Sequence, residues 1–140
     1  LAFGIMDGIV TLVGVLLALF VANADRKIVM ITTLAAAIAD STANAAGFHV
    51  AEEVGKKNTH SRAVRASLFS FIATFVTMMI PLIPILFFEL YYSIPLAILI
   101  GLLILFLLGS ITKNWKVGIE YFLIGAVAGS ICYLVSHFIS

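Results

Sequence analysis

The sequence is poor in charged residues and has a single cysteine. Only 11% of its 140 residues are charged, whereas an ordinary soluble domain carries about a quarter. With a formal net charge of +1 and no basic patch interleaved with aromatic residues, the chain is not expected to bind nucleic acid. Cys132 stands alone in an apolar run and cannot form a disulfide within the chain. The sequence also lacks a nucleophile–base pair, a glycine-rich phosphate loop and zinc-type Cys/His spacing, so we do not expect an enzyme.

Long apolar runs dominate what is present. Apolar residues make up 63% of the chain, and the mean hydropathy is +1.20. A helix that crosses the bilayer core of about 30 Å needs about 20 apolar residues. Five segments reach this length, approximately residues 2–22, 28–51, 63–87, 90–112 and 117–139. The sequence therefore predicts an all-α integral membrane protein, a single domain over residues 1–140 built as a bundle of five transmembrane helices.

Basic residues are distributed unequally between the two sides of this bundle. Six of them fall in the loops on the side of the N-terminus, and two on the opposite side, which are Lys56, Lys57, Arg62, Arg65, Lys113 and Lys116 against Arg26 and Lys27. Because short cytoplasmic loops carry the excess of Lys and Arg, we expect a cytoplasmic N-terminus. The membrane is expected to be the plasma membrane of a prokaryote or an organelle membrane.

The third segment has two internal features. Ser70, Thr74 and Met78 form a row at intervals of four, which we interpret mainly as core packing and only secondarily as a ligand row. Pro81 and Pro84 are expected to break or end the helix before it reaches the next segment, since proline cannot donate a backbone hydrogen bond.

Two aspartates lie inside the predicted spans. Asp7 shares one helix face with Gly4 and Thr11, and Asp40 lies one turn from Asn44 on the second span. An ionisable residue at the centre of a span costs about 2.5 to 3.5 kcal/mol, so it is a functional-site hypothesis by default. When the first two spans are placed antiparallel, Asp7 meets the level of Asn44 to His49, and Asp40 lies about a turn deeper.

Further polar residues lie where the second span ends. Glu52 and Glu53 follow Asp40 and Asn44 outward, and His49 is one turn before them. Carboxylate and amide oxygens suit hard or borderline divalent cations, and His49 could add to a metal site or contact lipid headgroups. His60 is expected to be a solvated loop residue. The ligand hypothesis thus comprises Asp7, Asp40, Asn44, His49, Glu52 and Glu53.

A structural interpretation of the aspartates remains open beside the functional one. A buried Asp can simply hydrogen-bond to a neighbouring helix and hold the bundle together. In that case the chain would be a non-transporting membrane subunit or a degenerate relative of a transporter. Transport of another solute on the same scaffold is a third alternative.

Several segments resemble the vacuolar iron transporter family. "GIMDGIVTLVG" (4–14) is similar to the first-helix motif of that family, and "LAAAIADSTANAAGFH" (34–49) to its small-residue second helix. "ASLFSFIATFVTMMIPLIP" (66–84) and "FLIGAVAGSICYLVSHFIS" (122–140) resemble its third and last helices. The resemblance covers almost the whole chain.

This resemblance implies a homodimeric exporter of Fe²⁺ or Mn²⁺ from the cytosol, in exchange for protons, with the bilayer, metal ions and protons as its partners. The metal is the transported substrate, and no permanently bound cofactor is implied. Asp7 matches the aspartate that belongs to the family's ion pathway at the dimer interface. The positions implied for helix packing or the dimer interface are Gly4, Gly8, Thr11 and Gly14.

The chain departs from the family pattern at several positions. The long, Glu-rich cytoplasmic insert between the second and third helices is replaced by about a dozen polar residues. Asn44 stands where many members carry Met, and Ala36 where plant members carry an acidic residue, with Asp40 one turn later. An amide oxygen in place of a thioether makes the site harder, which leaves Mn²⁺, Ca²⁺ and Mg²⁺ open beside Fe²⁺.

Overall fold

The structure is a computed structural model that describes residues 2–55 and 60–140, and its regular elements are all helical. The elements in chain order are α1 (Ala2–Val21), α2 (Arg26–Val54), α3 (His60–Met79), η1 (Ile80–Leu82), α4 (Ile83–Phe87), α5 (Leu90–Thr112) and α6 (Trp115–Ile139). Five helical stretches are long and apolar enough to cross a membrane, because α3, η1 and α4 follow one another without a break. The all-helical fold and the five spans agree with the prediction from the sequence.

The prolines of the third span interrupt its α-helix, as the sequence predicted. Pro81 lies in the 3₁₀ turn η1 and Pro84 at the start of α4, and the helical path continues to Phe87. Proline is tolerated in the first turn of a helix because its missing N–H has no intrahelical partner there. The two prolines therefore interrupt the regular α-helix at Met79, and the helical path ends at Phe87, before Glu89, which confirms the expectation of a break.

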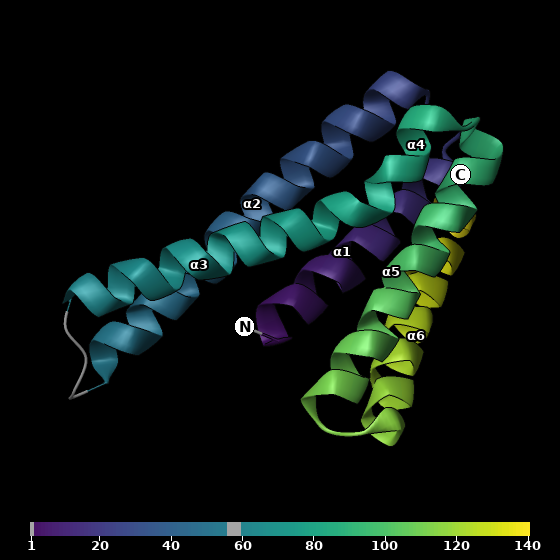
Figure 1. Cartoon of the computed structure of the whole chain (residues 1–140). Helices are drawn as coiled ribbons and strands as arrows, with labels where there is room; N and C mark the ends of the chain where they lie inside the picture. Colours follow the sequence, from purple (N-terminus) through teal and green to yellow (C-terminus); the bar gives the residue numbers. More distant parts are fainter. Residues whose placement is uncertain (1, 56–59) are drawn as a thin grey trace.

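The spans are arranged as two antiparallel hairpins around α1. Figure 1 shows α2 beside α3 and α5 beside α6, and α1 contacts all four of these helices. The N-terminus, the far end of α2, the start of α3 and the α5–α6 connection point to one end, called here the N-terminal end of the bundle (Figure 1). The α1–α2 turn, α4 and the C-terminus gather at the other end (Figure 1). A chain that crosses a membrane five times in succession must place its helix ends in these two groups.

Close packing holds α1 in its central position. Leu12 and Leu16 are fully buried, and they belong to one core cluster with Met78 from α3 and Ile94 from α5. The predicted row of Ser70, Thr74 and Met78 is buried along α3, which confirms it as a core-facing row. Most other large apolar side chains lie on the outside of the bundle, as expected of a surface that meets lipid.

Helix α2 is long enough to extend beyond the bilayer. Its 29 residues correspond to about 43 Å, whereas the hydrocarbon core is about 30 Å thick. Its first turn is fixed at the end of the bundle opposite to the N-terminus, where Asp25 accepts a hydrogen bond from the Ile28 N–H at 2.8 Å. The Arg26 guanidinium donates to the Ile85 and Phe88 carbonyls, each at 2.6 Å. The surplus length therefore carries the last turns of α2 toward the surface at the N-terminal end.

Candidate functional site

The first group of polar residues lies where α1 and α2 cross. Asp40 of α2 is half-buried, and its carboxylate interacts with the charge of Asp7 and with the Thr11 side chain, both on α1. Asp7 itself is exposed on the surface of the single chain. We call Asp7 and Asp40 the acidic pair. The structure thus brings together the two aspartates that the sequence placed on facing helices.

One oxygen of the acidic pair lacks a partner. Asp40 Oδ2 is buried without a hydrogen bond, and so are the hydroxyls of Ser41 beside it in α2 and of Thr74 in α3. Leaving a buried polar atom unpaired costs about 1 to 3 kcal/mol, and more for a charged group. A bound cation or a proton on the carboxylate would compensate the unpaired oxygen of Asp40. Ser41 is a residue that the sequence analysis did not single out, since a serine in a span can satisfy itself.

Asn44 lies one turn from Asp40, toward the N-terminal end. Its Nδ2 donates to the Gly4 carbonyl on α1 at 3.1 Å, so the amide links the two helices. The predicted level was wrong by about a turn, because Asn44 lies beside Gly4, whereas Asp7 was expected at this level. A cavity of about 340 Å³ opens beside it and is lined by residues of α1, α2 and α3, which are Phe3, Gly4, Ala43, Asn44, Gly47, Phe48, Ala51 and Ser70. Asn44 is therefore both a link between helices and a polar group on a cavity wall.

The second group of polar residues lies at the end of α2 and the start of α3. Glu53 Oε1 is 3.1 Å from His49 Nε2 and 2.7 Å from His60 Nδ1. The two imidazole rings meet edge to face, with centroids 5.6 Å apart. Among the described residues, these three form a group whose possible ligand atoms all lie within 4.8 Å of one another. We call His49, Glu53 and His60 the His–Glu–His cluster.

The His–Glu–His cluster differs in one member from the set predicted at this end of α2. His49 and Glu53 were predicted as ligands, whereas His60 was expected in a solvated loop. His60 is exposed, but it is the first residue of α3 and its ring faces Glu53. Glu52 is half-buried, has an interaction of its own and is not a member of the cluster. The sequence feature that could have placed His60 in a helix is the apolar helical pattern that begins just after it.

The small residues of α1 pack against helices of the same chain. A Cβ on Gly4 would lie 3.4 Å from Thr74 Oγ1, and one on Gly8 would lie 2.8 Å from Met78 Sδ, both on α3. A Cβ on Gly14 would lie 2.9 Å from the Cys132 sulfur on α6. The missing side chains of Gly8 and Gly14 therefore allow close packing within the bundle, whereas a Cβ on Gly4 would make an ordinary van der Waals contact. The role in a dimer interface that the resemblance implied for them stays a prediction.

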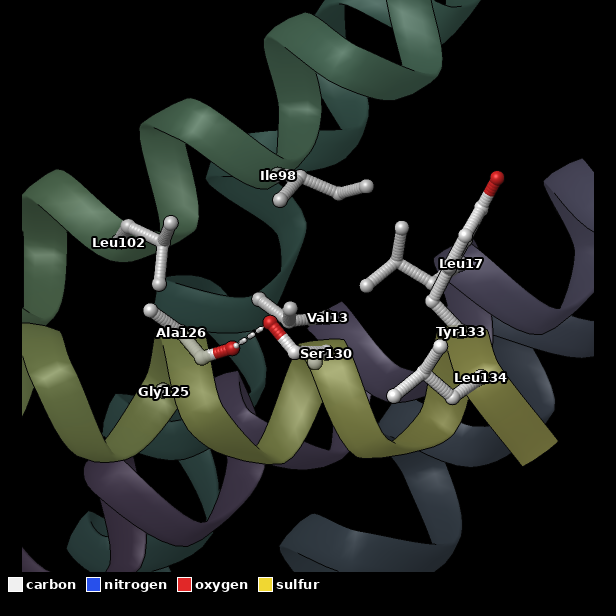
Figure 2. Close-up of a pocket in the computed structure, with 10 residues that line it drawn as sticks. Val13, Leu17, Ile98, Leu102, Gly125, Ala126, Ser130, Tyr133 and Leu134 are labelled. Atoms are coloured by element: carbon white, nitrogen blue, oxygen red, sulfur yellow. Dashed lines mark hydrogen bonds between the residues drawn. The ribbon is translucent and has the colours of Figure 1, made fainter. Parts of the chain in front are cut away.

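A cavity between α1, α5 and α6 has a different character. Figure 2 shows side chains that line it from all three helices, among them Val13 and Leu17 of α1, Ile98 and Leu102 of α5, and Leu134 of α6. Its volume is about 470 Å³. The Ser130 hydroxyl in its wall donates to the Ala126 carbonyl at 2.8 Å, so it is satisfied within its own helix (Figure 2). Its lining includes the hydroxyl groups of Ser130 and Tyr133 but no acidic, histidine or cysteine side chain, so it suits an acyl chain or an apolar side chain better than a metal ion.

Comparison with known proteins gives one match. A family model described as the VIT family matches residues 43–137, from the second half of α2 almost to the end of α6. The matched residues include Asn44 and the His–Glu–His cluster, whereas α1 and Asp40 precede them. No curated protein and no solved structure matches the chain.

Proposed function

Since the chain belongs to the VIT family, whose members are membrane transporters of metal ions and not enzymes, we propose that it exports Fe²⁺ or Mn²⁺ from the cytosol in exchange for protons. The acidic pair is the transport site in this proposal, and Asn44 supports it. The excess of basic residues at the N-terminal end of the bundle supports a cytoplasmic location of that end.

The observation that carries the proposal is the meeting of Asp7 and Asp40 within the spans. Two like charges held together repel, and one oxygen of Asp40 is buried without a partner. A divalent cation neutralises both carboxylates at once, and protons on the same oxygens do so as well. Because a metal ion and a proton compete for one carboxylate, such a pair can release protons as it binds the metal. This competition is the physical basis of exchange.

The cavity beside Asn44 supports access from the N-terminal end. It lies between the start of α1 and the last turns of α2, and Asn44 and Ser70 supply polar atoms to its wall. Asn44 is one turn from Asp40, so an ion in the cavity is about 6 Å along the helix axis from the acidic pair. The oxygen donors along this path suit hard and borderline divalent ions.

The exposure of Asp7 supports a homodimer. On a single chain this carboxylate would face lipid at a cost of about 2.5 to 3.5 kcal/mol. The same side of α1 forms a groove with α6 of about 520 Å³, lined among others by Thr11, Gly14 and Val15. A second copy that covers this face would remove Asp7 from lipid and bring two acidic pairs near each other. We therefore propose that the transporter is a dimer with α1 at its interface.

Transport into proteoliposomes tests the proposal. The variants Asp7→Asn and Asp40→Asn keep the size of the side chain but remove its charge, so each is expected to reduce Mn²⁺ and Fe²⁺ flux to the level of empty liposomes. Glu89→Gln is the matched control, because Glu89 is an exposed carboxylate in the connection from α4 to α5, at the other end of the bundle. It is expected to transport as the unmodified chain does.

A second measurement separates transport from structure. If the aspartates only hold helices together, both variants will keep full flux and lose thermal stability in detergent. That outcome would overturn the acidic pair as the transport site. Absence of flux from the unmodified chain would overturn transport itself and favour a non-transporting subunit. Loss of flux in the variants with an unchanged elution profile on size-exclusion chromatography supports the proposal.

A further inference from the structure

We propose that the His–Glu–His cluster is a second metal-binding site, one that selects transition-metal ions at the N-terminal end of the bundle. It is separate from the acidic pair, and its ligands come from the last turns of α2 and the first residue of α3. Its role as a capture site rests on the proposed function, whereas its ability to bind metal does not.

The geometry of the three side chains fits one ion. Ligand atoms about 2.1 Å from a metal lie about 3.0 Å apart in an octahedral site and about 3.4 Å apart in a tetrahedral one. Glu53 Oε1 already lies 3.1 Å and 2.7 Å from the two imidazole nitrogens. All the ligand atoms lie within 4.8 Å of one another, so rotation of the side chains alone brings them to a common centre.

The cluster can exchange its internal hydrogen bonds for metal bonds. A ring nitrogen that faces a carboxylate oxygen at these distances carries a proton and donates it. A neutral imidazole presents a lone pair at the same position once its proton sits on the other ring nitrogen. Binding of a cation therefore replaces the His49–Glu53 and Glu53–His60 contacts with three bonds to one ion, without any movement of the backbone.

The position of the three residues on the helices keeps the site assembled. His49 and Glu53 are four residues apart on α2, so their side chains leave the same helix face one turn apart. His60 begins α3, and α3 packs along α2 over its length. The edge-to-face contact of the two imidazole rings restricts the rotation of the His49 and His60 side chains. Packing of the helix pair, and not the chain between them, thus sets the distance between the ligands.

The ligand types determine which ions the site prefers. Two imidazole nitrogens and one carboxylate suit Fe²⁺, Mn²⁺, Co²⁺ and Zn²⁺, whereas Ca²⁺ and Mg²⁺ prefer oxygen ligands alone. The three side chains leave positions open for water, since the exposed fractions of His49, Glu53 and His60 are 28%, 45% and 75%. An exposed site with open positions binds and releases its ion readily.

The location gives the site a role in selection. His49 is five residues beyond Asn44 on α2, about 7.5 Å along the helix axis. Phe48 and Ala51, in the same turns of α2, line the cavity that contains Asn44. The oxygen-rich path at the acidic pair discriminates poorly between transition metals and Ca²⁺ or Mg²⁺. A nitrogen-containing site ahead of it would supply that discrimination.

Titration with Co²⁺ tests the proposal, because the visible absorption of Co²⁺ reports imidazole coordination. The protein is the full chain without an affinity tag, in detergent, and it carries Asp7→Asn and Asp40→Asn so that the acidic pair does not contribute. His49→Ala, Glu53→Gln and His60→Ala are each expected to weaken Co²⁺ binding by at least about tenfold, since even outer-shell changes cost about 10- to 100-fold. His137→Ala is the matched control, because His137 stacks on Tyr133 near the end of α6. We expect it to bind as the parent does.

The outcomes separate this inference from the proposed function. Absence of a Co²⁺ absorption band, an equal effect of His137→Ala, or displacement of Co²⁺ by equimolar Ca²⁺ would each overturn the site. None of those results bears on transport, which the flux of the Asp7→Asn and Asp40→Asn variants tests separately. Conversely, Co²⁺ bound by the three residues supports the site even when the chain transports nothing.

Discussion

Polar side chains on α2 are satisfied in two different ways. Thr33 and Thr42 donate to carbonyls of their own helix, Thr33 to Val29 at 2.6 Å and Thr42 to Ile38 at 2.7 Å. Asn44 instead donates to the Gly4 carbonyl on another helix. A hydroxyl bonded within its helix adds little to tertiary stability, whereas an amide that bridges two helices links their positions.

Replacement of Asn44 therefore has a measurable cost. Asn44→Leu keeps the volume but removes the donor to Gly4, whose carbonyl retains its own intrahelical bond. We expect the free energy of unfolding in detergent to fall by about 0.6 kcal/mol, and by no more than about 1.7, as for other interhelical hydrogen bonds in membranes.

Thr42→Val is the control for this prediction, since it removes a hydroxyl that serves only its own helix. It is expected to leave the free energy of unfolding unchanged within error. Equal losses in both variants would mean that Asn44 does not join α1 to α2.

At the scale of elements, the contact of α5 with α6 depends on missing side chains. A Cβ on Gly118 would lie 2.6 Å from the Phe106 carbonyl oxygen, and one on Gly109 would lie 2.7 Å from the Gly118 Cα. Both obstacles are backbone atoms, which cannot rotate away. Glycine at these positions therefore allows the two helix backbones to touch, the usual basis of tight packing in membranes.

We expect Gly118→Ala to push α5 and α6 apart. Overpacking of this kind costs about 1 to 3 kcal/mol, and an unfolding titration in detergent measures it. Gly47→Ala is the matched substitution on α2, where a Cβ would meet nothing within 4 Å. It is expected to be neutral or to stabilise the chain by up to about 1 kcal/mol through helix propensity. The reverse order of stabilities would contradict the described packing of α5 on α6.

At the scale of the whole molecule, α1 is surrounded by the other spans except along one side. That side bears the exposed Asp7, and farther along it Val15 lines the groove shared with α6. A central helix with an exposed acid is unlike the rest of the lipid-facing surface, which is apolar. A second copy that packs there would shield Asp7 from lipid and would bring the acidic pairs of the two chains near each other.

Cross-linking between copies tests this arrangement. In a chain whose Cys132 is replaced by Ala, Val15→Cys is expected to form a disulfide-linked dimer in membranes under mild oxidation, as seen on a non-reducing gel. Leu103→Cys, at an exposed position on α5, is the control and is expected to remain monomeric. Cross-linking of Leu103→Cys alone would place the interface on α5 and contradict the dimer proposed here.

The sequence by itself determined the fold class, the five spans and most of their limits. Hydrophobic length fixes these features, because every backbone polar group in a bilayer must be bonded within a helix. The span from Leu90 to Thr112 begins and ends where it was predicted. The sequence also placed Asp7 and Asp40 on facing helices, since helical periodicity and antiparallel crossing depend only on spacing along the chain.

Only the tertiary structure decided which helices touch and which faces remain exposed. His60 joins His49 and Glu53 because α3 starts against the end of α2, and no local pattern encodes that distance. The central place of α1, and with it the exposure of Asp7, follows from how glycines and large side chains of distant segments fit together. Shape complementarity between helices is a property of the assembled bundle, so it becomes visible only when all five spans are in place.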